Sequence, residues 1–333
     1  MNVAIVGLGY WGPNLLRTFN ENKNFKVKYA CDVLDRNIDK LKNKYPLVAF
    51  TKAYSDLLSD PDIDLICIAT PPETHYKLAS QALTNGKHVF IEKPMTTSVE
   101  DGEKLIMLAE ECGKLIFVDH TFVYSSPVKK IRELIANNSL GEPLYFDSER
   151  INLGLLQEHI NVIWDLAPHD FSILMNIFPD KKPLSLLAIG SKQIHKKVED
   201  MAYIVIRYPD DFVAHVHVSW LSPVKMRQTI IGGKNKMILY DDMSVSEKIK
   251  IYECGIDIPF NEETSFKPIY RSGDITVPKL SSDEPLAVEA EHVYQCIIGK
   301  ETPMVGGREG LEVVRLLEAC TTSMRENRTV NLK

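Results

Sequence analysis

Three residues have side chains suited to moving a proton, and each stands in a short, distinctive segment. They are Lys93 in Glu92-Lys93-Pro94, and Asp165 and His169 in Asp165-Leu166-Ala167-Pro168-His169. His169 is suited to general acid/base chemistry because the unperturbed pKa of imidazole lies near neutral pH. If Asp165 and His169 lie in one helix, their side chains share a face of it. If Pro168 is instead the first helical residue, Asp165 lies just ahead of the helix. A single lysine is more often a solvated charge, and a single histidine is more often a structural group. Whether these residues are catalytic therefore depends on the secondary-structure elements that position them.

A glycine-rich segment near the start of the chain has the spacing of a phosphate-binding turn. Gly7-Leu8-Gly9-Tyr10-Trp11-Gly12 follows an apolar run and precedes a helix that we expect to begin at Pro13. Such glycines allow a tight turn and close backbone approach to a pyrophosphate, and the free N–H groups of the helix start favour an anion. Asp32 follows about twenty residues later, where a carboxylate accepts from the ribose of NAD and repels the 2′-phosphate of NADP. The pattern therefore predicts NAD, with Arg36 as a complication and a purely structural turn as the alternative.

The first third of the chain alternates short β-branched runs with helix-length amphipathic segments. This alternation predicts an α/β fold, with a parallel, doubly wound sheet of the Rossmann type. The expected strands are Val3–Val6, Lys26–Cys31, Val48–Phe50, Leu65–Ala69, His88–Ile91 and Leu115–Asp119. The expected helices are Pro13–Asn20, Asp35–Tyr45, Ala53–Ser59, Thr74–Thr84 and Ser98–Glu111.

The pattern changes after about residue 120, where strands follow one another without helices between them. This predicts a C-terminal α+β domain with a large, open, mostly antiparallel sheet. Its expected strands are Leu144–Ile151, Ala202–Tyr208, Phe212–Trp220, Arg227–Gly232 and Lys236–Tyr240, and its expected helices are Pro127–Asn137, Pro168–Phe178, Pro285–Ile298 and Gly307–Asn327. A length of 333 residues fits two domains. We place them at 1–120 and 121–333, with the last helices able to pack back on the first domain.

Composition excludes several classes of protein. The net charge is −6 and no basic block occurs, which argues against nucleic acid or an acidic membrane surface as a partner. No apolar run reaches the roughly 18 residues of a membrane span, and we see no secretory signal. The six cysteines are scattered, as in a reduced, cytoplasmic protein. His215 and His217 share one face of a strand, but no third ligand is evident, so we expect no metal.

Four motifs in this order resemble the glucose–fructose oxidoreductase / inositol dehydrogenase family (Gfo/Idh/MocA). They are the glycine-rich turn, Ala69-Thr70-Pro71-Pro72-Glu73-Thr74-His75, Glu92-Lys93-Pro94 and Asp165-Leu166-Ala167-Pro168-His169. The resemblance spans essentially the whole chain. It implies hydride transfer between a carbinol carbon and NAD, with Lys93, Asp165 and His169 as catalytic residues and a cis Lys93–Pro94 bond. It further implies that NAD contacts Gly7, Leu8, Gly9, Tyr10, Trp11, Gly12, Asp32, Thr70, Pro71, Pro72, His75, Glu92, Lys93 and His120.

The class of substrate must be inferred from candidate binding residues in the second domain. Arg150, Lys225 and Arg227 are cations that could clamp phosphates, and Asn152 or Trp164 could contact a sugar ring, with solvated charge as the alternative. The complete expected set of substrate-binding residues is Lys93, Phe122, Arg150, Asn152, Trp164, His169, Lys225 and Arg227. For His120 and Phe122, at the domain junction, core packing is the alternative.

The segment Asn161-Val162-Ile163-Trp164 replaces the glycine-rich lead of the uronic-acid branch. The segment from Trp164 to Asp170, together with the lead-in Arg150–Gly154, resembles the branch that oxidises carbon 3 of UDP-linked N-acetylglucosamine. A dehydrogenase for a free sugar or inositol, an NAD-dependent glycosidase and a non-catalytic NAD-binding regulator stay as rivals. The resemblance also implies a homodimer or homotetramer formed through the open sheet.

Overall fold

The computed structural model describes residues 1–154, 156–157, 160–194, 196–257 and 268–332. The chain divides into two compact units, which we describe separately. Unit 1 comprises Met1–Tyr124 and Asp283–Leu316, and unit 2 comprises Ser125–Ser282 and Leu317–Lys333. The segment from Asp283 to Leu316 thus belongs to the unit that contains the N-terminus. The sequence placed the domain boundary at residue 120 and allowed the last helices to pack back on the first domain.

Unit 1 is built on a six-stranded parallel sheet with the order β3-β2-β1-β4-β5-β6. This is the strand order of a dinucleotide-binding Rossmann fold, and it confirms the predicted doubly wound sheet. Helices cover both faces of such a sheet, so its strands are apolar along their whole length, as in the four buried residues of β4. The strands are β1 Asn2–Val6, β2 Lys26–Cys31, β3 Ala49–Thr51, β4 Leu65–Ile68, β5 His88–Glu92 and β6 Ile116–Asp119.

The helices of unit 1 follow the strands in alternation. They are α1 Gly12–Glu21, α2 Asp35–Asp39, α3 Tyr54–Ser59, α4 His75–Thr84, α5 Val99–Cys112 and α8 Pro285–Ile297, with short 3-10 turns η1 Pro72–Thr74 and η2 Thr121–Tyr124. The predicted helix over Asp35–Tyr45 was wrong in its length, because α2 ends at Asp39 and hydrogen-bonded turns continue the chain. The sixth helix, α8, packs beside α1, and its apolar residues join the core of unit 1.

Unit 2 is built on a nine-stranded sheet with the order β16-β13-β12-β11-β7-β10-β9-β8-β17. Among the strand pairs that the structure describes in this sheet, β7 with β10 is parallel and the others are antiparallel. The predicted large, mostly antiparallel sheet is therefore confirmed. Its strands are β7 Pro143–Leu153, β8 Ser185–Ser191, β9 Met201–Arg207, β10 Val213–Ser219, β11 Leu221–Gly233, β12 Met237–Asp241, β13 Ile249–Tyr252, β16 Ile275–Thr276 and β17 Val330–Asn331.

Helix α7 Val162–Ile177 packs on strands β7, β9 and β10 of this sheet, and helix α6 Ser126–Ala136 packs on α7. Strands β14 Gly255–Asp257 and β15 Ile269–Arg271 form a separate antiparallel pair. The last helix, α9 Gly307–Glu326, begins in unit 1 and ends in unit 2. Within the described part of the chain, no helix is both long enough and apolar enough to cross a membrane.

Candidate active site

The glycine-rich turn between β1 and α1 has the backbone geometry that a pyrophosphate needs. A Cβ on Gly7 would lie 2.5 Å from the Ala69 carbonyl oxygen, and one on Gly12 would lie 1.8 Å from that of Gly7. A Cβ on Gly9 would meet nothing within 4 Å. Gly7 and Gly12 are therefore required for packing, whereas Gly9 keeps an open backbone surface at the start of α1. The turn thus fits the diphosphate of a dinucleotide.

Asp32 follows β2 and holds the turn. Its carboxylate accepts from the backbone N–H of Leu8 at 2.7 Å, from that of Leu34 at 2.8 Å and from the Asn37 side chain at 3.0 Å. A carboxylate has about four acceptor positions, so one is left for a ribose hydroxyl. Asp32 therefore fits both the predicted role toward NAD and a structural one.

His75 at the start of α4 joins two loops of unit 1. Its Nδ1 lies 2.9 Å from the Pro94 carbonyl oxygen and its Nε2 lies 2.8 Å from that of Thr70. The side chain is fully buried, and this burial lowers its pKa, although the two carbonyls favour the protonated form. His75 therefore holds the Thr70–Pro72 segment to the Lys93–Pro94 segment, and its expected contact with NAD stays a prediction.

Lys93 follows β5, and its peptide bond to Pro94 is cis, as the family resemblance implied. The Glu92 carboxylate accepts the backbone N–H of Lys93. Burial and, to a smaller extent, the positive charge of Lys93 lower the pKa of His120 to about 3. His120 is thus a neutral imidazole close to Lys93. Phe122 lies half-buried nearby in η2.

Sequence reasoning missed two carboxyl groups in this part of unit 1, those of Asp119 and Glu289. Asp119 ends β6 next to Glu92 of β5, and its Oδ2 accepts the Trp11 indole N–H at 2.7 Å. Its place at the carboxyl end of a parallel strand was an available signal, because ligands of such folds bind there. Glu289 lies inside α8, where no local pattern marks it.

The helix that carries Asp165 and His169 begins earlier than predicted. It starts at Val162, because the Asn161 side chain accepts the backbone N–H of Trp164 at 3.2 Å and caps the first turn. The prediction that Pro168 starts the helix was wrong, since Pro168 lies inside α7. Of the two alternatives for Asp165 and His169, the structure shows the first: both lie on α7, one turn apart, and share a face.

Two tryptophans fix this segment within unit 2. The Trp220 indole N–H donates to Asp165 Oδ2 at 3.0 Å, and the Trp220 side chain is 1% exposed. Gly154 fits beneath it, since a Cβ there would lie 2.4 Å from Trp220 Cδ1. Trp164, which we predicted to contact the sugar, donates its indole N–H to Thr321 Oγ1 at 3.0 Å. Asp165 is thus held by a buried residue that the sequence did not single out.

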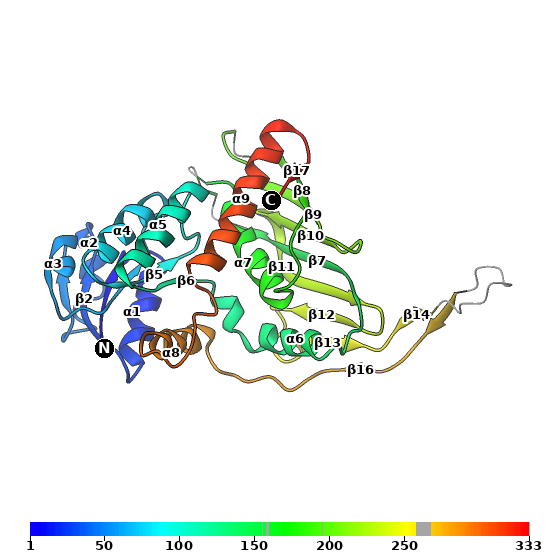
Figure 1. Ribbon diagram of the computed structural model, residues 1–333, viewed down its shortest axis with the longest axis horizontal. Coiled ribbons are helices and arrows are strands. Elements are labelled where there is room, and N and C mark those ends of the chain that lie inside the picture. The colour runs from blue at the N-terminus through cyan, green and yellow to red at the C-terminus, as the bar shows by residue number, and fades with distance from the viewer. Residues whose placement is uncertain (155, 158–159, 195, 258–267, 333) are drawn as a thin grey trace. The chain divides into compact units, whose positions relative to one another are not determined.

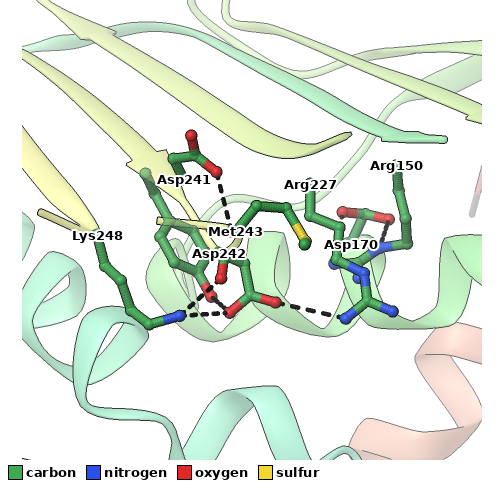
Figure 2. Close-up of polar contacts among 8 residues, drawn as sticks. Arg150, Asp170, Arg227, Asp241, Asp242, Met243 and Lys248 are labelled. Atoms are coloured by element: carbon green, nitrogen blue, oxygen red, sulfur yellow. Dashed lines mark hydrogen bonds and ion pairs between the residues drawn. The ribbon is translucent and has the colours of Figure 1, made fainter. Parts of the chain in front are cut away.

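Of the three cations predicted to clamp phosphates, Arg150 is engaged inside the protein (Figure 2). It is 4% exposed, and its Nε lies 2.8 Å from Asp170 Oδ2 while its Nη2 lies 3.2 Å from Oδ1. This buried pair gives Arg150 a structural role, and the expectation that it clamps a phosphate stays a prediction. Arg227 is half-exposed and lies 3.4 Å from Asp242, and Lys225 is exposed.

Asp242 also pairs with Lys248 at 3.3 Å. The half-exposed network around Asp242 therefore differs from the Arg150–Asp170 pair of the same figure, which is buried. Burial alone would raise the pKa of Asp242, but Lys248 and Arg227 hold it below its ordinary value. Asn152, the remaining expected sugar contact, is half-buried near the end of β7.

Each unit therefore brings one set of predicted site residues together. In unit 1 the glycine-rich turn, Asp32, Thr70–Pro72, Lys93 and His120 all follow the carboxyl ends of parallel strands. In unit 2 Asp165 and His169 share one face of α7. Within the described ranges no cluster of three or more His, Cys, Asp or Glu side chains is arranged to hold a metal ion.

Comparison with known proteins identifies the family. Residues 1–120 match the family model described as "Oxidoreductase family, NAD-binding Rossmann fold", and residues 132–332 match the C-terminal alpha/beta domain of the same family. The chain therefore belongs to the Gfo/Idh/MocA oxidoreductase family, and its cofactor is NAD.

Individual relatives are distant. An uncharacterized oxidoreductase of Escherichia coli, YdgJ, is 28% identical over 63% of this chain and 63% of its own length. The scyllo-inositol 2-dehydrogenase (NADP(+)) IolW of Bacillus subtilis is 23% identical over 100% of this chain and 96% of its own length. Among solved structures, UDP-N-acetylglucosamine 3-dehydrogenase GnnA from Acidithiobacillus ferrooxidans has a TM-score of 0.82 at 20% identity, covering 98% of both chains. That likeness shows a common fold.

Proposed function

We propose that this protein is an NAD-dependent dehydrogenase that oxidises carbon 3 of a UDP-linked N-acetylglucosamine-type sugar. The observation that carries the proposal is the pairing of Asp165 and His169 on one face of α7, with Asp165 held by the buried Trp220. An imidazole and a carboxylate one turn apart form an acid/base pair suited to removing a hydroxyl proton.

Bound NAD supplies the acceptor for the hydride that leaves the carbinol carbon. His169 takes the hydroxyl proton, and Asp165 orients the imidazole or accepts a hydrogen bond from the sugar. Lys93, as a cation, stabilises negative charge on the reacting oxygen. Lys93 and His169 belong to different units, so their joint action is part of the proposal.

The nucleotide-linked substrate is supported by Lys225 and Arg227, the two predicted phosphate-binding cations that stay at the surface of unit 2. The fold shared with GnnA, whose substrate its name gives, is in keeping with this choice. A runner-up is an inositol dehydrogenase, because the scyllo-inositol 2-dehydrogenase IolW aligns with the whole chain.

A panel of nucleotide sugars, free sugars and inositols with NAD, followed at 340 nm, separates these candidates. The proposal expects NADH formation with UDP-N-acetylglucosamine and none with inositol or glucose. Turnover of inositol alone would establish the runner-up. Release of free sugar from a glycoside without net NADH would indicate the glycosidase class.

His169→Ala is expected to lower kcat by about a hundredfold to ten-thousandfold, the usual contribution of a general acid/base. His215→Ala is the matched control, since it removes an imidazole from the sheet of the same unit. Equal effects of the two substitutions would remove His169 from the mechanism. A protein that binds NAD but turns over no member of the panel would instead be the non-catalytic regulator.

We also propose that copies of the chain associate through one face of the nine-stranded sheet. Ile189, Tyr203, Val205 and Val213 are exposed there, and the rings of His215 and His217 stack on Tyr203 at 6.1 and 4.3 Å. Contiguous exposed apolar side chains commonly mark interfaces. Light scattering should give a dimer or tetramer, and Val205→Lys should shift it toward the monomer, whereas a monomeric wild-type chain would refute the assignment.

A further inference from the structure

Asp119 and Glu289 form a buried carboxyl pair in unit 1 that neither the motifs nor the proposed chemistry uses. Asp119 is 2% exposed at the end of β6, and Glu289 is 1% exposed in α8. The two carboxyl groups interact directly, since each of them shifts the pKa of the other. Two ionised carboxylates have only acceptor atoms, so a hydrogen bond between them requires one proton on the pair. Two neighbouring buried carboxylates of like charge would also be strongly unfavourable.

The surroundings place that proton on Glu289. Asp119 accepts from the Trp11 indole at 2.7 Å and from the Thr121 hydroxyl, and the positive charge of Lys93 is close to it. Burial raises the pKa of Asp119 above its ordinary value, but these three neighbours all favour its ionised form. Glu289 Oε2, by contrast, has no hydrogen-bond partner among the described residues, and Glu92 brings a second negative charge toward it.

The remaining titratable neighbours do not change this assignment. Burial raises the pKa of Cys67 and of Tyr124 well above their ordinary values, so both are neutral near pH 7. His120 is neutral as well, with a pKa of about 3. The charged groups beside the pair are thus Glu92 and Lys93, one of each sign. Burial and the adjacent Asp119 raise the pKa of Glu289 well above its ordinary value.

We propose that protonated Glu289 and ionised Asp119 are positioning residues for the NAD-binding turn, acting through the Trp11 indole. Trp11 stands between Gly9 and Gly12, so its hydrogen bond fixes the part of the turn that faces the diphosphate. Loss of the shared proton would place two negative charges in one buried site and displace that contact. The affinity for NAD is therefore coupled to the protonation of Glu289.

The direction of this coupling follows from linkage. A carboxyl whose pKa is raised by folding keeps its proton at neutral pH and loses it as the pH rises through the raised value. NAD affinity should then be constant at lower pH. It should fall by up to about tenfold per pH unit above the pKa of Glu289, because binding requires the protonated pair.

The test is a calorimetric titration of the full chain with NAD between about pH 5 and pH 9.5. Glu289→Gln, whose neutral amide still donates to Asp119, should bind NAD within about twofold of wild type at pH 7 and keep that affinity at alkaline pH. Glu291→Gln on the same helix is the matched control and should follow the wild-type curve, because the pKa of Glu291 is lowered and this group is ionised throughout the alkaline range.

Trp11→Phe is a second variant, at a half-buried position outside the carboxyl pair. It should weaken NAD binding by about tenfold at pH 7, the usual value of a hydrogen bond to a charged acceptor. Superimposable pH curves for wild type and Glu289→Gln would overturn the proposal. So would a large loss of affinity in Glu289→Gln at pH 7, or normal affinity in Trp11→Phe. None of these outcomes depends on the sugar substrate.

Discussion

The NAD-binding turn of unit 1 and the helix α7 of unit 2 hold their functional groups by different means. In the turn, backbone atoms of Gly7 and Gly12 approach so closely that no side chain fits between them. On α7, Asp165 and the neighbourhood of His169 depend on side-chain partners, the Trp220 indole and the Arg150–Asp170 pair. Adding a side-chain atom to a glycine should therefore disrupt the geometry of the turn. Removing a partner side chain should instead displace the functional groups on α7.

The largest expected effect comes from breaking the buried pair beside His169. Asp170 is 1% exposed and accepts from Arg150 and from the Ser148 hydroxyl at 2.8 Å. Asp170→Asn leaves the Arg150 charge buried without its carboxylate, which typically costs about 3–5 kcal/mol. Urea denaturation followed by tryptophan fluorescence should show an early transition.

Asp242→Asn is the control for this substitution. It makes the same change in the half-exposed network with Arg227 and Lys248, where a pair contributes about 1 kcal/mol or less. Equal destabilisation by the two variants would show that burial does not distinguish the pairs.

The next effect tests the turn by adding one methyl group. Gly12→Ala forces its Cβ to within 1.8 Å of the Gly7 carbonyl oxygen unless the backbone moves. We expect a loss of about 1–3 kcal/mol from overpacking, together with loss of the thermal shift that NAD produces. Gly9→Ala has open space in the free protein, so it should melt normally without NAD and yet show a reduced NAD-induced shift. A Gly9→Ala protein destabilised as much as Gly12→Ala would contradict this distinction.

The same contrast explains what the sequence could predict. The strands of unit 1 lay within about one residue of their expected bounds, because a buried parallel strand is a continuous apolar run. The glycine-rich turn was recognisable because the glycines that its backbone conformation requires lie within six consecutive residues. The start of α7 was misplaced because Pro168 suggested a first helical position, although Asn161 carried the capping signal.

Contacts between residues distant in the chain could not be predicted. Trp220 lies 55 residues from Asp165, and Asp119 lies 108 residues from Trp11. Arg150 was expected to bind phosphate because an isolated arginine in a sequence gives no indication of a buried partner. Its pairing with Asp170 depends on packing α7 against β7, which no local pattern specifies.

The smallest expected effect concerns Trp220 as a positioning residue for Asp165, and it rests on the proposed dehydrogenase activity. Trp220→Phe keeps an aromatic ring over Gly154 but removes the indole donor at 3.0 Å from Asp165. We expect kcat to fall about tenfold with little change in KM, since one hydrogen bond to a charged group is worth about 1.5 kcal/mol or more. Thr321→Val is the matched control, because it removes the acceptor of the other indole on this segment, that of Trp164, without touching Asp165. It should leave kcat within about twofold. If both variants lower kcat equally, the effect is one of general packing in unit 2; if only Trp220→Phe does, Asp165 acts through an orientation that its buried neighbour maintains.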